Sequence, residues 1–240
     1  MTYVIGDVHG FYDTMVDLTR QLPADSRIIF VGDLIDRGPD SAKVVQYVRE
    51  KRYECVKGNH EYLMTSYGHE VIKSIVAKQK FIEIDPDWKE NGAIPTLRSY
   101  GLTRGRDEYG NLVVASDAIR HIDRFIDDMR WMQNLALYIE LDQNDKAGRP
   151  IVISHASVAR SWDLRHSGIE SSMRLFEDDA LWNREAPPQD SGIFNIFGHT
   201  PQCDAPRVAQ NHVNVDGGIY SNRENFGKLV AYCVECENPE

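Results

Sequence analysis

The chain has 240 residues, 42% of them hydrophobic, which is enough to bury the core of one large domain. Its formal net charge of −10 argues against a nucleic-acid-binding surface, which is usually basic, and no apolar run is long enough to span a bilayer. We therefore expect a single domain over residues 1–240, with neither nucleic acids nor membranes among its partners.

The N-terminal quarter of the chain predicts alternating strands and helices. Short apolar runs that end before polar turns predict three buried strands, at residues 3–5, 27–31 and 53–57. Apolar residues at helical spacing predict a helix over residues 11–22, which Pro23 ends. A second helix is expected to begin at Pro39-Asp40-Ser41, and a third at about residue 60. This order of elements implies a parallel or mixed sheet with right-handed crossovers.

The middle of the chain is less regular, and its second half is predicted to be rich in strands. Residues 66–115 have weak periodicity and many turn residues, which predicts an irregular excursion or lid. A helix is expected over about 117–131, and a hairpin is expected from the runs at 135–141 and 151–154. Further strands are predicted at 193–197, 213–215 and 229–234.

The cysteines give no sign of a disulfide framework. Cys233 and Cys236 have the spacing of half a zinc site, but no second pair accompanies them. We expect two reduced cysteines at the end of a strand. Because the first strand is predicted to begin at about residue 3, there is no room for a signal peptide, and we expect a cytoplasmic location.

Each of the three N-terminal strands is followed by glycine and then by oxygen or imidazole donors. The three turns are Gly6-Asp7-Val8-His9-Gly10, Gly32-Asp33-Leu34-Ile35-Asp36-Arg37-Gly38 and Gly58-Asn59-His60-Glu61. Crowded carboxylates such as Asp33 and Asp36 need cations or protons to offset their repulsion. These acids are also common in helix caps, but the matching positions of Asp7 and Asn59 favour a metal site at the rim of the sheet.

Six side chains that follow predicted strands are the candidate metal ligands: Asp7, His9, Asp33, Asn59, His155 and His199. Oxygen and imidazole donors without a thiolate suit Mn²⁺, Fe or Zn²⁺ better than Ca²⁺. Six ligands are too many for one tetrahedral zinc ion, and they suit two metal ions that share a carboxylate, for which Asp33 is the natural bridge. We expect two divalent metal ions, with Mn²⁺ favoured and Fe or Zn²⁺ as alternatives.

Two such ions can hold a hydroxide and clamp the oxygens of a phosphoryl group. The leaving oxygen then needs a proton, and His60 is the candidate general acid, held in place by Asp36. Arg37 and Arg184 are candidate phosphate ligands, because a guanidinium group offers forked donors. The alternative for Arg184 is an ion pair with its neighbour Glu185.

Five other polar residues are not assigned a catalytic or metal-binding role. Asp216 fits two interpretations equally well, as a partner of a metal-bound histidine or as a turn residue before Gly217-Gly218. The histidines that fit no motif, and that we expect to be structural or exposed, are His69, His121, His166 and His212.

These motifs resemble those of the binuclear, calcineurin-like metallophosphoesterases. The first three turns, as spelled here, are similar to the phosphoprotein phosphatase (PPP) branch, and Ser154-His155-Ala156 and Gly198-His199-Thr200-Pro201 complete the pattern. The nearer resemblance is to bacterial and phage-lambda-type serine/threonine phosphatases, which Trp182-Asn183-Arg184-Glu185 and the stretch from Trp88 to Gly92 also resemble. The motifs extend from residue 6 to about 218, so the resemblance covers nearly the whole chain.

The resemblance implies an α/β (α+β) fold, namely a two-sheet β-sandwich flanked by helices, with the metals at the C-terminal edge of the strands. It implies that one metal ion is held by Asp7, His9 and Asp33, and the other by Asp33, Asn59, His155 and His199. It also implies His60 as the general acid paired with Asp36, and Arg37 and Arg184 as phosphate ligands.

Our first functional hypothesis is a metal-dependent phosphomonoesterase. It removes phosphate from phosphoserine or phosphothreonine proteins, with phosphotyrosine a further candidate, by direct attack of a metal-bridging hydroxide, and it cleaves small phosphoesters in vitro. The alternative is a hydrolase of diadenosine tetraphosphate or another dinucleoside polyphosphate. That related group often replaces the acid equivalent to Asp36 and tends towards Asp at the position of Glu61, so both residues favour the phosphatase. A non-catalytic binding module is disfavoured, because neither a ligand nor His60 is missing.

Overall fold

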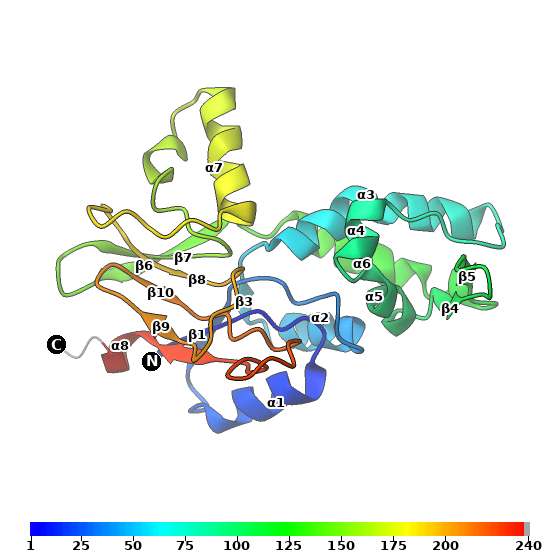
Figure 1. Cartoon of the computed structure of the whole chain (residues 1–240), viewed down its shortest axis with the longest axis horizontal. Coiled ribbons are helices and arrows are strands. Elements are labelled where there is room, and N and C mark those ends of the chain that lie inside the picture. Colours follow the sequence, from blue (N-terminus) through cyan, green and yellow to red (C-terminus); the bar gives the residue numbers. More distant parts are fainter. Residues whose placement is uncertain (238–240) are drawn as a thin grey trace.

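The computed structural model describes residues 1–237, in which two β-sheets pack face to face and helices cover both outer sides (Figure 1). The first sheet has the order β11-β1-β2-β3. Its strands are β1 (Thr2–Ile5), β2 (Arg27–Phe30), β3 (Glu54–Cys55) and β11 (Ala231–Cys233). β1, β2 and β3 are parallel, and β11 pairs antiparallel with β1. The β-α-β-α-β order predicted for the N-terminal part is therefore confirmed.

The second sheet has the order β6-β7-β8-β10-β9. Its strands are β6 (Tyr138–Asn144), β7 (Pro150–Ser154), β8 (Phe194–Phe197), β9 (Arg207–Val208) and β10 (His212–Asn214). β6 and β7 form the predicted hairpin, whereas β7, β8 and β10 are parallel to one another. Each sheet thus has a parallel centre, and the carboxyl ends of its parallel strands meet at one edge.

The alternation of side chains along each strand explains how the sheets pack. Val4 and Ile29 point into the sandwich, where they meet Ile151 and Ile153 of the second sheet. Their neighbours on the same strands, such as Phe30, point to the opposite face and join the core beneath the helices. Successive side chains of a strand lie on opposite faces of its sheet. These short apolar strands therefore contribute side chains both to the core between the sheets and to the core beneath the helices.

The helices continue these cores. Their bounds are α1 (Tyr12–Gln21), α2 (Ser41–Glu50), α3 (Asn59–Val76), α4 (Pro86–Glu90), α5 (Ala93–Ser99), α6 (Ile122–Gln133), α7 (Glu170–Trp182) and α8 (Val234–Glu237), with 3₁₀ turns at Ala118–Arg120 and Trp162–Leu164. Apolar residues of α1 to α6 form one cluster with the outer face of the first sheet. Phe176 and Ala180 of α7 pack against Val152 on the outer face of the second sheet.

Residues 66–115 are more regular than we predicted. They contain the end of α3, the short helices α4 and α5, and a hairpin of β4 (Thr103–Arg106) and β5 (Leu112–Val114) that lies at the far end of the molecule from the sheets (Figure 1). Periodicity misses α4 and α5 because each has only five to seven residues. Local signals define them instead: Asp85 caps α4 by accepting from the Asp87 N–H at 2.9 Å. That this segment closes as a lid stays a prediction.

Two further expectations need correction at the C-terminal part of the chain. The run at 229–234 forms a strand only as far as Cys233, because α8 begins at Val234. The helical turn brings the Cα atoms of Cys233 and Cys236 to 5.3 Å, and the two cysteines form a disulfide instead of staying reduced. Helix α7 was not predicted at all. Within residues 1–237, no helix has both the length and the apolarity needed to cross a membrane.

Candidate metal centre

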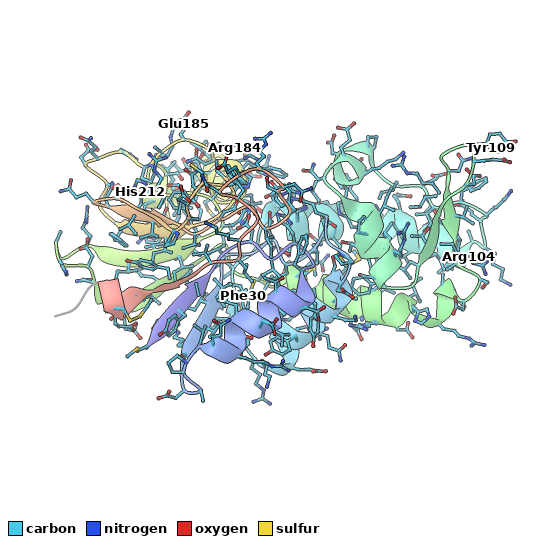
Figure 2. The ribbon with its side chains drawn as sticks, turned by 60° about the horizontal axis from the view of Figure 1, so that its bottom comes forward. Phe30, Arg104, Tyr109, Arg184, Glu185 and His212 are labelled. Carbon is cyan, nitrogen blue, oxygen red and sulfur yellow. A yellow bond between two sulfur atoms is a disulfide. The ribbon has the colours of Figure 1, made fainter. Side chains whose placement is uncertain are left out.

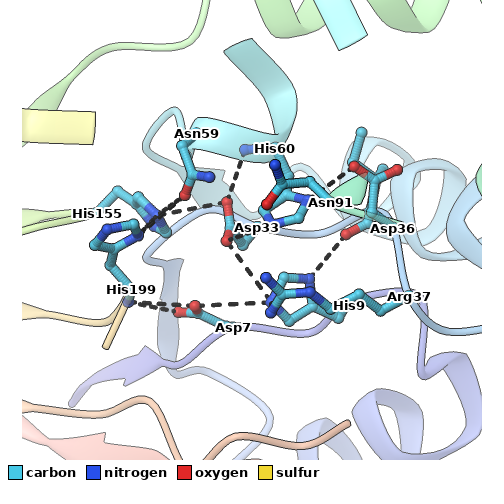
Figure 3. A network of polar contacts seen from close by, with 12 residues as sticks. Asp7, His9, Asp33, Asp36, Arg37, Asn59, His60, Asn91, His155 and His199 are labelled. Atoms are coloured by element: carbon cyan, nitrogen blue, oxygen red, sulfur yellow. Dashed lines mark hydrogen bonds and ion pairs between the residues drawn. The ribbon is translucent and has the colours of Figure 1, made fainter. Parts of the chain in front are cut away.

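The candidate ligands come together at the edge where the parallel strands of both sheets end (Figure 3). Asp7, Asp33 and Asn59 follow β1, β2 and β3, whereas His155 and His199 follow β7 and β8. All five side chains are buried, none with more than 6% of its surface exposed. Residues far apart in the sequence thus meet because parallel strands present their carboxyl ends on the same side.

Glycines make room for these side chains in the turns. A Cβ atom at Gly58 would lie 2.2 Å from Asp33 Oδ1, and one at Gly198 would lie 2.1 Å from Asp7 Oδ1. The backbone is also unusual at the donors themselves: Asp33 and His199 have φ values of 50° and 65°. Left-handed conformations cost energy for residues other than glycine, and such strain is common at functional sites. Gly58 and Gly198 therefore allow close packing against a candidate ligand.

Asp33 lies at the middle of the cluster. Its Oδ1 is 3.5 Å from His155 Nε2, and its Oδ2 is 3.7 Å from both His9 Nε2 and His60 Nε2. One carboxylate thus faces two sets of donors with its two oxygens. Two groups able to hold a metal ion share it, His9-Asp33-His60 and Asp33-His155-His199. This is the geometry expected of a bridging carboxylate.

The donor atoms around His155 fit a bound cation. His155 Nδ1 donates to the carbonyl oxygen of Val31 at 2.9 Å, so in the neutral ring Nε2 carries a lone pair. That lone pair faces Asn59 Oδ1 at 2.8 Å and His199 Nδ1 at 3.1 Å. His9 is held in the same way, by donation from its Nδ1 to the Ile35 carbonyl at 3.0 Å. His155 Nε2 and Asn59 Oδ1 are both acceptors and repel each other at 2.8 Å, and a cation between them removes the repulsion.

Burial sets the charge of these groups. It lowers the pKa of His155 and His9, and together with His155 it lowers the pKa of His199 to about 3, so all three rings are neutral and able to bind a metal. Burial also raises the pKa of Asp7, to which the nearby Asp216 and Asp33 add. Burial alone would raise the pKa of Asp33, but the surrounding histidines, through the charge that each carries when protonated, lower it overall. A site with neutral histidines and crowded carboxylates attracts divalent cations.

His60 and Asp36 form the expected pair beside these donors. His60 Nδ1 lies 2.8 Å from Asp36 Oδ2, and both side chains are fully buried. Burial alone would lower the pKa of His60, but Asp33 and Asp36 raise it overall. His60 Nε2 is buried without a hydrogen-bond partner and faces Asp33. The ring therefore has one nitrogen fixed and the other open to the site.

Two residues that we did not single out for this role hold Asp36. Trp88 Nε1 donates to Asp36 Oδ2 at 3.0 Å, and the hydroxyl of Thr96 donates to Asp36 Oδ1 at 2.6 Å. Both side chains are fully buried. They belong to α4 and α5, so the segment at 66–115 reaches the pair of His60 and Asp36 through these two helices. The only signal in the sequence was the resemblance of the stretch that begins at Trp88.

Glu61 has a structural role in the same turns. Its carboxylate accepts from the backbone N–H groups of Asp33 and Leu34, each at 2.8 Å, and of Gly58 at 2.9 Å. Burial, followed by the charge of Asp33, raises the pKa of Glu61 to about 7. Because the Glu61 carboxylate binds backbone groups of two turns, the presence of Glu rather than Asp at this position is explained by the structure of these turns. The identity of residue 61 is therefore a weak guide to the substrate.

The two arginines lie on different sides of the cluster. Arg37 Nη1 is 2.9 Å from His9 Nε2, and the guanidinium group stacks on Tyr220 at 4.0 Å from the ring centroid. Arg184 is exposed at the rim, and its charge contributes to the lowered pKa of His155 and His199. The proposed pairing of Arg184 with Glu185 is wrong, because Glu185 pairs with Arg160.

Asp216 follows β10 at the same edge. Its Oδ1 accepts from the Gly218 N–H at 2.8 Å, as the turn interpretation predicts. Its Oδ2 is buried with no hydrogen-bond partner in the part of the chain that the structure describes, and burial raises the pKa of Asp216 to about 6. Asp216 therefore acts on the site through its charge rather than through a bond to a candidate histidine ligand.

Comparison with known proteins agrees with this geometry. The family model described as calcineurin-like phosphoesterase matches residues 2–203. Bis(5'-nucleosyl)-tetraphosphatase PrpE [asymmetrical] from Geobacillus sp. is 27% identical over 240 aligned residues, which cover 90% of this chain and 84% of the relative. A symmetrical bis(5'-nucleosyl)-tetraphosphatase from Cronobacter sakazakii is 29% identical over 68% of this chain, which spans only 45% of that relative. Serine/threonine-protein phosphatase 1 from Salmonella typhimurium is 39% identical, but over 25% of this chain and 30% of its own length.

Proposed function

We propose that this chain, which belongs to the calcineurin-like phosphoesterase family, hydrolyses dinucleoside polyphosphates such as diadenosine tetraphosphate. That it is a metal-dependent phosphoesterase follows from the family. The choice of substrate class rests on the relatives, since a tetraphosphatase aligns with 90% of the chain whereas the protein phosphatase aligns with 25%. The alternative substrate class that we drew from the sequence is therefore favoured over phosphoproteins.

The observation that carries the chemistry is the pair of donor groups that share Asp33. In this proposal one metal ion would be held by His9 and Asp33 with Asp7, whose Oδ2 lies 4.0 Å from His9 Nε2, in place of the His60 of the first donor group. The second ion would be held by Asp33, Asn59, His155 and His199. When bound, the two ions supply positive charge that polarises the phosphoryl group. We infer Mn²⁺ as the ion, with Fe or Zn²⁺ as alternatives, because the donors are oxygen and imidazole. We also keep a cytoplasmic location as part of the proposal.

The residues of the chain supply the remaining steps. Arg37, stacked on Tyr220 beside His9, binds a phosphoryl oxygen, and Arg184 binds phosphate from the rim. His60 keeps Nδ1 bonded to Asp36 and gives the proton on Nε2 to the leaving oxygen. The raised pKa of His60 keeps that proton available near neutral pH.

One observation favours the phosphoprotein phosphatase as a second candidate. The pair of Asp36 and His60 is complete, and two further donors hold Asp36. A general acid matters most when the leaving oxygen is strongly basic, as in phosphoserine, and less when the leaving group is a phosphate. The chain therefore has a complete general-acid pair, His60 and Asp36, that a polyphosphate substrate alone would not require.

The test is a side-by-side measurement with the Mn²⁺-loaded protein on diadenosine tetraphosphate and on a phosphoserine peptide. We expect kcat/KM to be higher for the dinucleotide, and Asp33→Asn to abolish turnover of both substrates. Separation of the nucleotide products shows whether the tetraphosphate chain is cut symmetrically. Strong turnover of the peptide with little of the dinucleotide would refute the proposal and restore the phosphatase.

A further inference from the structure

A pocket of about 270 Å³ adjoins the metal centre at the ends of β8 and β10. Thr200, the residue after His199, lines the pocket, and so does Asn214, which ends β10 just before Asp216. Arg184 lines it as well. Figure 2 shows Arg184 and His212 in one half of the molecule and Arg104 and Tyr109 of the β4–β5 hairpin at the far end of the other half. The loop after β8 thus carries both a candidate ligand, His199, and a residue that lines the pocket, Thr200.

The wall of the pocket carries two arginines without carboxylate partners. Neither Arg184 nor Arg207 forms an ion pair among residues 1–237, although the chain carries a net charge of −10. Arg207 donates only to the neutral Gln202, at 3.2 Å. The one acid in the wall, Glu185, is neutralised by Arg160. Two arginines without carboxylate partners thus line one pocket of an acidic protein, and such a pocket suits an anion.

The same pocket contains a flat, uncharged ring. His212 lies over Phe197, with ring centroids 5.7 Å apart and an angle of 31° between the planes. Burial, aided by the charge of Arg207, lowers the pKa of His212, so the imidazole is neutral at pH 7. A neutral ring fixed against another ring offers a surface on which a nucleobase can stack.

We propose that this pocket binds the part of a dinucleoside polyphosphate that lies beyond the bond being cleaved. Arg184 and Arg207 bind its phosphates, and His212 stacks on its base. Arg184 joins the two sites, because it lines the pocket and its charge also reaches His155 and His199. Pockets for whole drug-sized ligands measure roughly 300–1,000 Å³, so this smaller one fits one nucleotide portion of the substrate. The inference rests on the proposed function.

The test compares Arg207→Gln and His212→Ala with a matched control, Arg104→Gln, which changes an exposed arginine at the far end of the molecule (Figure 2). We expect Arg207→Gln to raise KM for diadenosine tetraphosphate about ten-fold more than KM for p-nitrophenyl phosphate, as the loss of a charge-assisted hydrogen bond predicts. The control should change neither value. All proteins contain the whole 240-residue chain and are loaded with Mn²⁺.

Inhibitors separate the phosphate contacts from the base contact. ADP and inorganic tripolyphosphate are each tested against hydrolysis of p-nitrophenyl phosphate. Arg207→Gln should weaken inhibition by both compounds, whereas His212→Ala should weaken inhibition by ADP and leave that by tripolyphosphate unchanged. Equal effects of His212→Ala on both inhibitors would refute base stacking.

The two possible failures can be told apart. In the first case the wild-type protein hydrolyses the dinucleotide, and Arg207→Gln and His212→Ala have the same KM for the dinucleotide and the same inhibition by ADP as the wild-type protein. The pocket assignment is then wrong and the proposed function stands. If the wild-type protein hydrolyses p-nitrophenyl phosphate but not the dinucleotide, the proposed function is wrong, and the pocket assignment falls with it.

Discussion

His60→Asn tests the assigned acid directly. The amide of Asn can still donate a hydrogen bond to Asp36, but it cannot give a proton to the leaving oxygen. His60 Nε2 is buried without a partner, 3.7 Å from Asp33 Oδ2, whereas Nδ1 is fixed at 2.8 Å from Asp36. The substitution therefore removes the one open nitrogen of the ring and leaves the candidate ligands in place.

The expected loss depends on the leaving group. General acid catalysis contributes about 10²–10⁴-fold, which is about 3–5 kcal/mol of activation free energy. We expect kcat for a phosphoserine peptide to fall by that factor, because an alkoxide is a poor leaving group. For diadenosine tetraphosphate and p-nitrophenyl phosphate, whose leaving groups are weaker bases, we expect a loss of about ten-fold or less.

The assay is steady-state kinetics on the three substrates, with metal content measured by elemental analysis of the same preparations. His121→Asn, which changes a partly exposed histidine on the surface, is the control for the substitution itself. An equal loss on all three substrates with metals bound would refute the role of His60 as a proton donor. Loss of metal from His60→Asn would make it a ligand instead.

Three further predictions concern stability. Thr96→Val removes the hydroxyl that donates to buried Asp36, and should lower the free energy of unfolding by about 1.5–3 kcal/mol in urea denaturation, with Thr96→Ser as the control that keeps the bond. Burial alone would raise the pKa of Asp145, but hydrogen bonds from Arg149 lower it overall. The paired carboxylate therefore stabilises the fold fully at pH values above the ordinary pKa of 3.8. This stabilisation is lost as the pH falls through the lowered pKa. Asp145→Asn should therefore destabilise the protein by about 1 kcal/mol at pH 7 and progressively less in acid; a constant difference would contradict this. Removal of divalent metal by a chelator should lower Tm by about 5–10 °C, because ions at 100 times their Kd stabilise the fold by about 2.7 kcal/mol, and Mn²⁺ should restore it.

The candidate site could be predicted from the sequence because its donors follow strands. A short apolar run predicts a strand, a strand ends at the rim of its sheet, and parallel strands share that rim. Asp7, Asp33 and Asn59 are therefore expected together, and His155 and His199 are expected with them from the other half of the chain. The structure brings these side chains to one edge.

The residues that support the site could not be predicted in the same way. Trp88 and Thr96 lie on helices too short for periodicity to detect, and only the folded chain shows that they reach Asp36. His212 fits no motif, and its place in the pocket depends on the parallel pairing of β10 with β8. The disulfide of Cys233 and Cys236 depends on a helical turn that begins where a strand was expected to continue.

Every role assigned to this site depends on two divalent ions that share Asp33. The most direct test is the number of Mn²⁺ ions bound per chain, measured by titration together with electron paramagnetic resonance. We predict two ions whose spins are coupled in the wild-type protein, and loss of that coupling in Asp33→Asn. A single bound ion, or two ions without coupling in the wild-type protein, would contradict the account.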